Sequence, residues 1–257
     1  MFNLENFDIK LDTEFIGRNF IYADTLYSTN TYLMDKQNEI NTNGTVVLAE
    51  TQTHGRGRKD RVWYSAPESN LTFSVLLTNN KPLLKHSNLI NFAASLAVSV
   101  SIENLFQIKT DLKWPNDVLL NRKKTSGILL ESSSIGNKIN RLVVGIGINV
   151  NQNSFQGTFN YPPTSIRIEL GRIVEREKLL SEVLNNFELL LLKIENNSSS
   201  IIEEWKSKCN MIGERISIVD NDFEKFGIFY DVDEEGFLLL KTKDRIEKIH
   251  FGDLSLR

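Results

Sequence analysis

The sequence predicts an α+β fold in which a mixed β-sheet with long helices is followed by a small domain of short strands. Between residues 20 and 150, short apolar runs rich in branched side chains have the length of buried strands. Two longer segments instead repeat apolar residues every three or four positions, the spacing of a helix face. From Ile212 onward the pattern changes to short strands with polar turns. We therefore expect a larger domain over residues 1–211 and a small one over residues 212–257.

The elements of the larger domain follow in order. After a strand near residues 20–22 and a helix over 31–38, strands are predicted at residues 45–50, 71–77, 112–114, 118–120, 125–131 and 141–150. Long helices are predicted over residues 83–106 and 177–194, and a short one over 201–208 after the polar residues 196–200. In the first long helix, one apolar stripe should face the core; it consists of Leu89, Phe92, Ala93, Leu96, Ala97 and Val100.

The small domain is predicted to contain only strands. They are expected at residues 215–219, 225–230, 236–241 and 245–251, with a tight turn at 233–236. Strands this short, following one another so closely, are typical of a small barrel.

The composition restricts the class of protein. Hydrophobic residues make up 40% and charged residues 25% of the chain, as in ordinary globular proteins. The formal net charge of −3 provides no basic field for nucleic acid, so no DNA partner is expected. A single cysteine, Cys209, excludes an internal disulfide and fits a reducing compartment. No signal peptide and no apolar run of membrane-spanning length is found, so we expect a cytoplasmic protein without a membrane partner.

A basic segment stands out at residues 52–63. Gly55 and Gly57 alternate with Arg56 and Arg58, and Trp63 follows shortly after. Glycines let backbone N–H groups approach a ligand closely, and guanidinium groups grip carboxylates or phosphates with paired donors. The segment is no Walker loop, because no Gly-Lys-Ser/Thr closes it. Alone it fits either an anion-binding loop, mobile until its ligand arrives, or a nucleic-acid contact.

Other segments decide between these interpretations. Residues 28–30 (Ser-Thr-Asn) precede the basic segment, and Lys-Trp-Pro-Asn-Asp at 113–117 and Lys-Lys-Thr-Ser-Gly at 123–127 follow it. Gly-Ile-Gly-Ile-Asn-Val-Asn at 145–151 completes the set. Together, from about Tyr22 to the C-terminus, the sequence resembles biotin–protein ligases. The two glycines at 145 and 147 fit either β-bulges or a close approach of ligand to the sheet.

The resemblance implies a fold and an activity. Its catalytic domain would be similar to class II aminoacyl-tRNA synthetases, with an SH3-like C-terminal barrel. Biotin and ATP, with Mg²⁺ as the counter-ion of the triphosphate, would form biotinyl-5′-AMP, and biotin would then pass to a lysine of a biotin carboxyl carrier domain. Family members often form homodimers through a sheet edge. Some carry an N-terminal helix-turn-helix, for which the first twenty residues are too few, so a monofunctional enzyme is expected.

The resemblance also implies site residues. Those expected at biotin or its acyl carboxylate are Ser28, Thr29, Asn30, Gln52, Gly55, Arg56, Gly57, Arg58, Lys124 and Gly127. Those expected at ATP or the adenylate are Arg61, Trp63, Asn116 and Asn149. The catalytic candidates are Arg58, Lys124 and Asp117; for Asp117 a structural pairing with a nearby lysine is nearly as well supported. No protein-held metal is expected, because His54, His86 and His250 lie far apart.

One feature departs from the family pattern. Lys59-Asp60 stands where Arg-Gly is frequent, and the acidic, stiffer residue puts closure of the basic segment in question. Two alternatives to a biotin ligase are a lipoate ligase, which is similar in fold, and a nucleic-acid binder that uses the basic segment.

Overall fold

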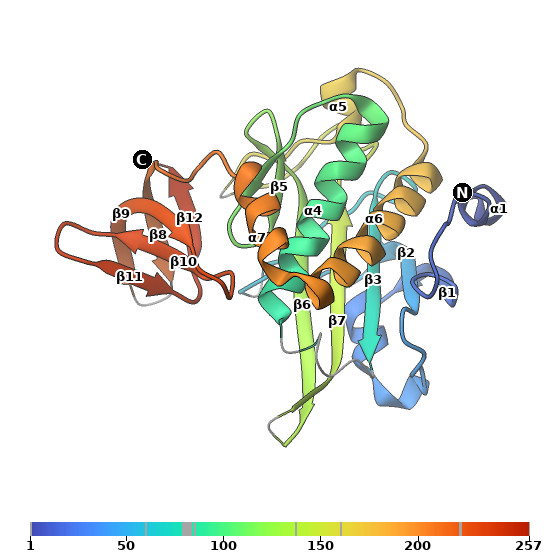
Figure 1. Cartoon of the computed structure of the whole chain (residues 1–257). Helices are drawn as coiled ribbons and strands as arrows, with labels where there is room; N and C mark the ends of the chain where they lie inside the picture. Colours follow the sequence, from blue (N-terminus) through green and yellow to red (C-terminus); the bar gives the residue numbers. More distant parts are fainter. Residues whose placement is uncertain are drawn as a thin grey trace.

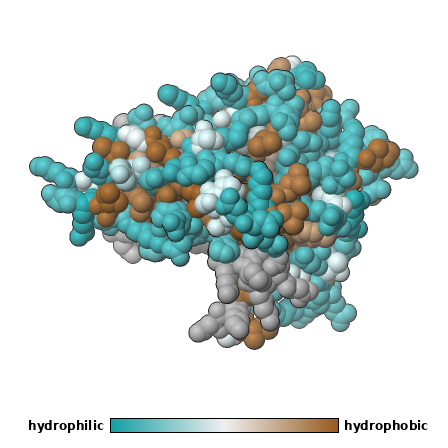
Figure 2. All heavy atoms as spheres, viewed as in Figure 1, coloured by the Kyte–Doolittle hydropathy of each residue, from teal (hydrophilic) through white to brown (hydrophobic). Residues whose placement is uncertain are grey.

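The computed structural model describes residues 2–59, 61–78, 84, 86–136, 138–159, 161–220 and 223–256. It contains two sheets, and three helices stack in front of the larger one (Figure 1). The small C-terminal domain lies to one side of the larger domain (Figure 1). Most of the face seen in Figure 2 is hydrophilic, with hydrophobic side chains scattered over both domains. The predicted α+β class is confirmed.

A seven-stranded mixed sheet forms the larger domain. Its order is β1-β2-β3-β7-β6-β5-β4, in which β1 and β2 are parallel and the other neighbours antiparallel. The strands are β1 (Phe20–Leu26), β2 (Val46–Gln52), β3 (Leu71–Thr78), β4 (Asp111–Lys113), β5 (Asp117–Leu120), β6 (Lys123–Ile135) and β7 (Lys138–Ile148). Each predicted strand therefore exists, although β6 and β7 are longer than expected.

Helices α4 (Ser87–Phe106), α6 (Arg176–Asn196) and α7 (Ser198–Ser207) cover one face of this sheet (Figure 1). The single apolar stripe predicted for α4 is too narrow. Residues all around the helix are buried, and even Ser95, Ser99 and Ser101 are enclosed and satisfied by hydrogen bonds. The sheet lies on one side and α6 and α7 on others, so apolar side chains are needed on several faces. Although α4 is long and apolar enough to cross a membrane, it packs here as a core helix.

The opposite face of the sheet carries a shorter helix. The segment predicted as one helix is split into α2 (Thr29–Met34) and the 3-10 turn η1 (Lys36–Asn38). The Ser28 side chain accepts a hydrogen bond from the Thr31 N–H and caps α2, as its position before the helix predicts. Leu33 of α2 packs on a small second core with Val47, Leu76 and Val143. This contact holds the C-terminal part of α2 against the sheet.

A five-stranded antiparallel sheet forms the C-terminal domain, in the order β11-β10-β9-β8-β12. Its strands are β8 (Arg215–Asp220), β9 (Phe223–Val232), β10 (Leu238–Lys241), β11 (Ile246–Ile249) and β12 (Asp253–Leu256). Strand β12 was not predicted from the sequence. The short helices α1 (Leu4–Asp8) and α5 (Ile166–Leu170) were missed as well. Elements of four or five residues show too few repeats for a period to be recognised.

The β9–β10 turn fastens the small domain to the large one. The Trp114 indole donates to the Gly236 carbonyl at 3.2 Å, and the Asn88 amide donates to the Glu235 carbonyl at 3.1 Å. Phe92 and Trp205, stacked at 4.3 Å between ring centroids, lie beneath this contact. Because Trp114 belongs to the Lys-Trp-Pro-Asn-Asp segment, the small domain is anchored next to that segment.

The side chain of Glu188 on α6 binds the backbone of residues 14–16, which precede β1. This buried carboxylate on α6 accepts the backbone N–H groups of Glu14, Phe15 and Ile16 at 2.5, 3.0 and 2.8 Å. Glu188→Ala leaves three N–H groups without their acceptor, so we expect the free energy of unfolding to fall by roughly 3 kcal/mol. Urea denaturation measures this, with the exposed neighbour substitution Leu189→Ala expected to stay within about 0.5 kcal/mol. Equal effects of both substitutions would contradict the assignment.

Candidate functional site

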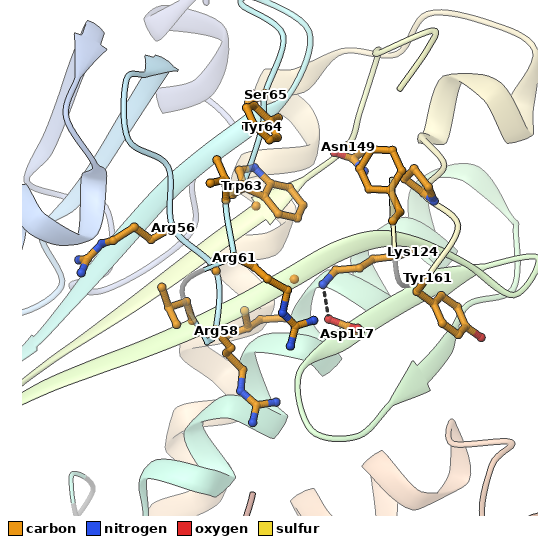
Figure 3. Close-up of a pocket in the computed structure, with 18 of the residues that line it drawn as sticks. Arg56, Arg58, Arg61, Trp63, Tyr64, Ser65, Asp117, Lys124, Asn149 and Tyr161 are labelled. Atoms are coloured by element: carbon orange, nitrogen blue, oxygen red, sulfur yellow. Dashed lines mark ion pairs between the residues drawn. The ribbon is translucent and has the colours of Figure 1, made fainter. Parts of the chain in front are cut away.

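A cavity of about 1260 Å³ opens between the larger sheet, the basic segment and the C-terminal domain. Figure 3 shows basic, aromatic and acidic side chains from distant segments meeting there. The predicted site residues that line it are Ser28, Thr29, Asn30, Gln52, Arg56, Gly57, Arg58, Arg61, Trp63, Asn116, Asp117, Lys124, Gly127 and Asn149. The structure thus brings together segments that lie more than a hundred residues apart.

Glycines form the floor of the cavity. Gly145 and Gly147 of β7 pair in regular register with Ser74 and Thr72 of β3, so neither is a bulge. A Cβ atom at Gly145 would collide with the Asn30 side chain, and one at Gly147 with the Trp63 indole. The space the two glycines leave is therefore filled by side chains that line the cavity, which explains why these positions lack a side chain.

Polar side chains at the start of α2 form a connected network. Gln52 Oε1 accepts hydrogen bonds from the Thr29 N–H at 2.7 Å and its hydroxyl at 3.1 Å. The Ser74 hydroxyl joins Thr29 Oγ1 and Asn30 Oδ1 at 2.7 and 2.6 Å. Asn30 Nδ2 donates to a Glu131 carboxylate oxygen at 2.8 Å. Ser74 and Glu131, which the sequence did not indicate, thus fix the orientation of the predicted polar groups.

The basic segment is a narrow hairpin. Arg56 and Val62 form a bridge, the Gly57 N–H donates to the Arg61 carbonyl at 2.6 Å, and the Trp63 N–H donates to the Gly55 carbonyl at 3.0 Å. A Cβ atom at Gly55 would collide with the Trp63 carbonyl, so this glycine is needed where the hairpin closes. Gly55 lies outside the wall of the main cavity and lines a neighbouring one. Asp60, expected to affect closure, lies outside the described residues.

Carboxylates from other elements pair with the cations of the hairpin. Arg56 points away from the other arginines in Figure 3 and meets Glu131 of β6 at 2.8 Å. Lys59 pairs with Asp220 at 2.7 Å, and Arg61 pairs with Asp253 at 2.5 Å. Asp220 and Asp253 belong to β8 and β12. Lys59 also lies 3.6 Å from Asp253, so three ion pairs join the small domain to the hairpin.

Arg58 is placed differently. It donates two long hydrogen bonds to neutral oxygens, Asn116 Oδ1 at 3.4 Å and the Gly252 carbonyl at 3.5 Å. Burial lowers the pKa of Arg58 from its usual value, while the nearby Asp253 and Asp117 oppose that shift. An arginine with long, neutral contacts in a partly buried cleft can gain from the arrival of an anion.

Asp117 is shared by two lysines. Its carboxylate lies 2.6 Å from Lys124 Nζ, the ion pair drawn in Figure 3, and 3.6 Å from Lys113 Nζ. Burial alone would raise the pKa of Asp117, but the charges of Lys124 and Lys113 outweigh it and hold the pKa below its usual range. The structural pairing expected as one role of Asp117 is therefore present. Lys113, also in the cavity wall, was not predicted.

Aromatic residues from the segment after β7 complete the wall. Phe155, Phe159 and Tyr161 lie there, and the Asn149 amide donates to the Thr164 carbonyl at 3.0 Å. The backbone N–H of Lys124 donates to the Pro162 carbonyl at 2.8 Å, which ties this segment to β6. Val219, Asp253, Leu254 and Ser255 of the small domain also contribute. None of these residues was predicted from the sequence. For the segment after β7, the aromatic residues among 155–161 were the one available signal; for the residues of the small domain there was none.

Two observations bear on what the cavity could hold. Among the residues that the structure describes, the buried Trp63 indole N–H and the buried Thr72 hydroxyl have no hydrogen-bond partner. They lie in the cavity wall, where the acceptor of a ligand could satisfy them. In the part of the chain that the structure describes, no group of three or more His, Cys, Asp or Glu side chains could hold a metal ion.

The fold thus places a cleft between two domains, and basic side chains from the hairpin and the sheet line it. The chain belongs to the Biotin/lipoate A/B protein ligase family: the family's sequence model matches residues 22–149, and that of the Biotin protein ligase C terminal domain matches residues 211–257.

Individual relatives agree with this membership. The chain is 36% identical over 249 residues to the bifunctional ligase/repressor BirA of Bacillus subtilis, covering 96% of this chain and 76% of that protein. It is 32% identical over 201 residues to the biotin–[acetyl-CoA-carboxylase] ligase of Paracoccus denitrificans, covering 76% and 83%. Among solved structures, the biotin protein ligase of Aquifex aeolicus in complex with biotin and ATP superposes with a TM-score of 0.81, at 32% identity and 93% and 99% coverage.

The contact between Gly147 and Trp63 can be tested in the protein without a ligand. In Gly147→Ala the new methyl group occupies the position of the Trp63 indole, so the indole must move toward solvent. Trp114 and Trp205 are buried, and a change in emission therefore reports Trp63. We expect red-shifted tryptophan fluorescence and faster acrylamide quenching, with both differences lost when Gly147→Ala is made in a Trp63→Phe background. Unchanged emission in a folded Gly147→Ala variant would contradict the arrangement.

Proposed function

We propose that this protein activates biotin with ATP in the cleft and transfers it to a lysine of a biotin carboxyl carrier domain. Biotin ligation is the activity named for its relatives, and the Aquifex aeolicus structure was solved with biotin and ATP bound. The observation that carries the proposal is the charge of the cleft. Arg58, Lys113 and Lys124 bring three positive charges to the cleft, and Asp117 is shared by the two lysines. Asp253, whose charge also acts on Arg58, is already ion-paired with Lys59 and Arg61, so the cleft keeps an excess of positive charge.

The reaction has two balanced steps. The biotin carboxylate attacks the α-phosphorus of ATP, the bond to the β-phosphate oxygen breaks, and pyrophosphate leaves. The ε-amine of the carrier lysine then attacks the acyl carbon of biotinyl-5′-AMP, loses a proton, and AMP leaves. Both steps concentrate negative charge around one phosphate, so fixed cations beside it stabilise both transition states. The cleft acts mainly through positioning and electrostatics.

Residue roles follow from position. The network of Ser28, Thr29, Asn30 and Gln52 offers both donors and acceptors, which the cyclic urea of biotin requires. Arg58 and Lys124 would hold the acyl carboxylate and the α-phosphate. Trp63, Asn116 and Asn149 would face the nucleotide, with Arg61 at the cavity mouth. Gly57, Gly127 and Arg56 shape the wall around the acyl group.

Two further roles concern Asp117 and Mg²⁺. We assign to Asp117 the orientation and deprotonation of the carrier lysine, because it is the predicted acidic residue in the cavity wall. The Mg²⁺ that ATP carries would be bound through the triphosphate, since Asp117 is already paired with two lysines.

Organisation and partners complete the proposal. The division into residues 1–211 and 212–257 is supported by the two separate sheets and by the C-terminal match that begins at residue 211. β5 pairs with β6 as far as Gly127, and the remaining described part of β6 offers an edge through which a homodimer could form. We place the enzyme in the cytoplasm, where carboxylases are made, and propose no DNA partner, consistent with the net charge of −3.

Lys124 gives the direct test. Lys124→Ala removes a cation that forms charge-assisted hydrogen bonds worth roughly 1.5–3 kcal/mol, so biotin-dependent pyrophosphate exchange should fall by about ten- to a hundredfold. The matched control is Lys123→Ala, whose exposed side chain pairs with Glu169 outside the cavity and which should keep full activity.

The same assay tests the function itself. The wild-type protein should label a carrier domain in the presence of ATP and biotin, read by streptavidin blot. Labelling with lipoate in place of biotin would instead indicate a lipoate ligase. A protein that supports neither exchange nor transfer with either acid would refute the proposed function.

A further inference from the structure

We propose that Lys113 is a second counter-ion of Asp117 that lets Lys124 leave Asp117 and bind the substrate anion. Lys113 would then be a positioning residue that acts through Asp117 and Lys124. The inference rests on the proposed function, and it assigns a task to a residue that the sequence did not single out. It starts from the unequal distances of 2.6 Å and 3.6 Å that join the two lysines to one carboxylate.

Lys124 cannot serve its substrate and Asp117 fully at once. Its Nζ lies on an Asp117 oxygen, and Asp117 is almost completely buried. When an anionic carboxylate or phosphate draws Lys124 away, a buried carboxylate loses its nearest cation. Removing one partner of a buried ion pair is strongly unfavourable, because the other charge stays uncompensated. Substrate binding through Lys124 therefore requires a replacement cation beside Asp117.

Lys113 meets this requirement. It ends β4, directly opposite Asp117 at the start of β5 in the antiparallel register, so the backbone holds the pair together. Its side chain is buried, and its Nζ lies 5.0 Å from the centre of the Tyr161 ring, which attracts the ammonium on another side. A small approach of Lys113 Nζ from 3.6 Å to hydrogen-bond distance would complete the replacement.

The exchange requires Lys124 to be able to move and Lys113 to stay in place, and the exposure of the two side chains agrees with this. The Lys124 side chain is 26% exposed, whereas that of Lys113 is 8% exposed. Lys124 also lies next to the register shift between β5 and β6, and its Cε and Nζ lie over the open Gly127 position. Lys124 is thus the cation that can turn toward a ligand, and Lys113 is the one that stays.

A comparison of single and double variants distinguishes a counter-ion role of Lys113 from direct binding of substrate by Lys113. In Lys113→Met, Lys124 is the one ion-pair partner left to Asp117 among the described residues, so biotin-dependent pyrophosphate exchange should fall by about tenfold, mostly through a raised KM for biotin. Asp117→Asn removes the carboxylate for which Lys124 is needed. Lys113→Met/Asp117→Asn should therefore recover to within about threefold of Asp117→Asn alone. Lys113→Arg should keep most of the exchange, and the exposed Lys109→Met should have no effect.

The outcomes are distinct. If the double variant remains as slow as Lys113→Met, Lys113 binds a substrate phosphate directly and the counter-ion task is wrong. If Lys113→Met equals wild type, Lys124 needs no replacement and the proposal also fails. Exchange concerns only the first half-reaction, so a role of Asp117 in the transfer to the carrier does not disturb the comparison. A wild-type protein without biotin-dependent exchange would instead overturn the proposed function.

If Lys113→Met does not fold, equilibrium binding of biotin to Asp117→Asn tests the proposal instead. Circular dichroism and thermal melting report folding, and calorimetry measures biotin affinity of Asp117→Asn. With Lys124 released, Asp117→Asn should bind biotin at least as tightly as wild type. A purely structural ion pair predicts the opposite, and a dissociation constant raised by more than about tenfold would refute the proposal.

Discussion

Repulsion among the basic side chains of one cleft is the constraint on which this structure depends. Arg56, Lys59, Arg61 and Lys124 each pair with a carboxylate, which offsets the repulsion among basic side chains gathered around a partly buried site. The carboxylates come from different elements: Glu131 from β6, Asp117 from β5, and Asp220 and Asp253 from the C-terminal domain. The position of the basic hairpin is thus set jointly by both domains. This makes the small domain part of the active cleft, although it holds little of the recognised sequence pattern.

The site also depends on space above the sheet for the side chains of Trp63 and Asn30. Trp63 and Asn30 can reach the floor of the cleft only because β7 carries glycine at two positions on the same face, spaced by two residues. That spacing keeps Gly145 and Gly147 in an unbroken ladder, so the strand is not weakened by a bulge. The floor is therefore a continuous stretch of sheet, whereas ion pairs to other elements hold the hairpin above it.

The sequence predicts which residues line the site better than it predicts which residues pair with them. Period and length reveal the strands, and the recognised segments converge on one cavity because strand ends meet at one side of the sheet. The partners of their side chains were hidden, since Asp253 is 192 residues from Arg61 and no local pattern connects them. Lys113 was visible inside the quoted segment, yet only the antiparallel pairing of β4 with β5 brings it beside Asp117. Helix α4 shows the converse error: its period predicted one buried face, while packing against α6 and α7 buries the others.

Arg58 and Lys124 lie in the same cleft but meet an anion under different conditions. The hydrogen bonds of Arg58 go to the neutral oxygens of Asn116 and Gly252 and are long, so an incoming anion adds a strong contact and displaces weak ones. Lys124 begins in a short ion pair with Asp117, so for this side chain the anion exchanges one charged partner for another. Arg58, which belongs to the hairpin that the C-terminal domain holds, can therefore gain an anion without giving up an ion pair. In the exchange proposed for Lys124, by contrast, binding of an anion requires the rearranged pairing of Asp117.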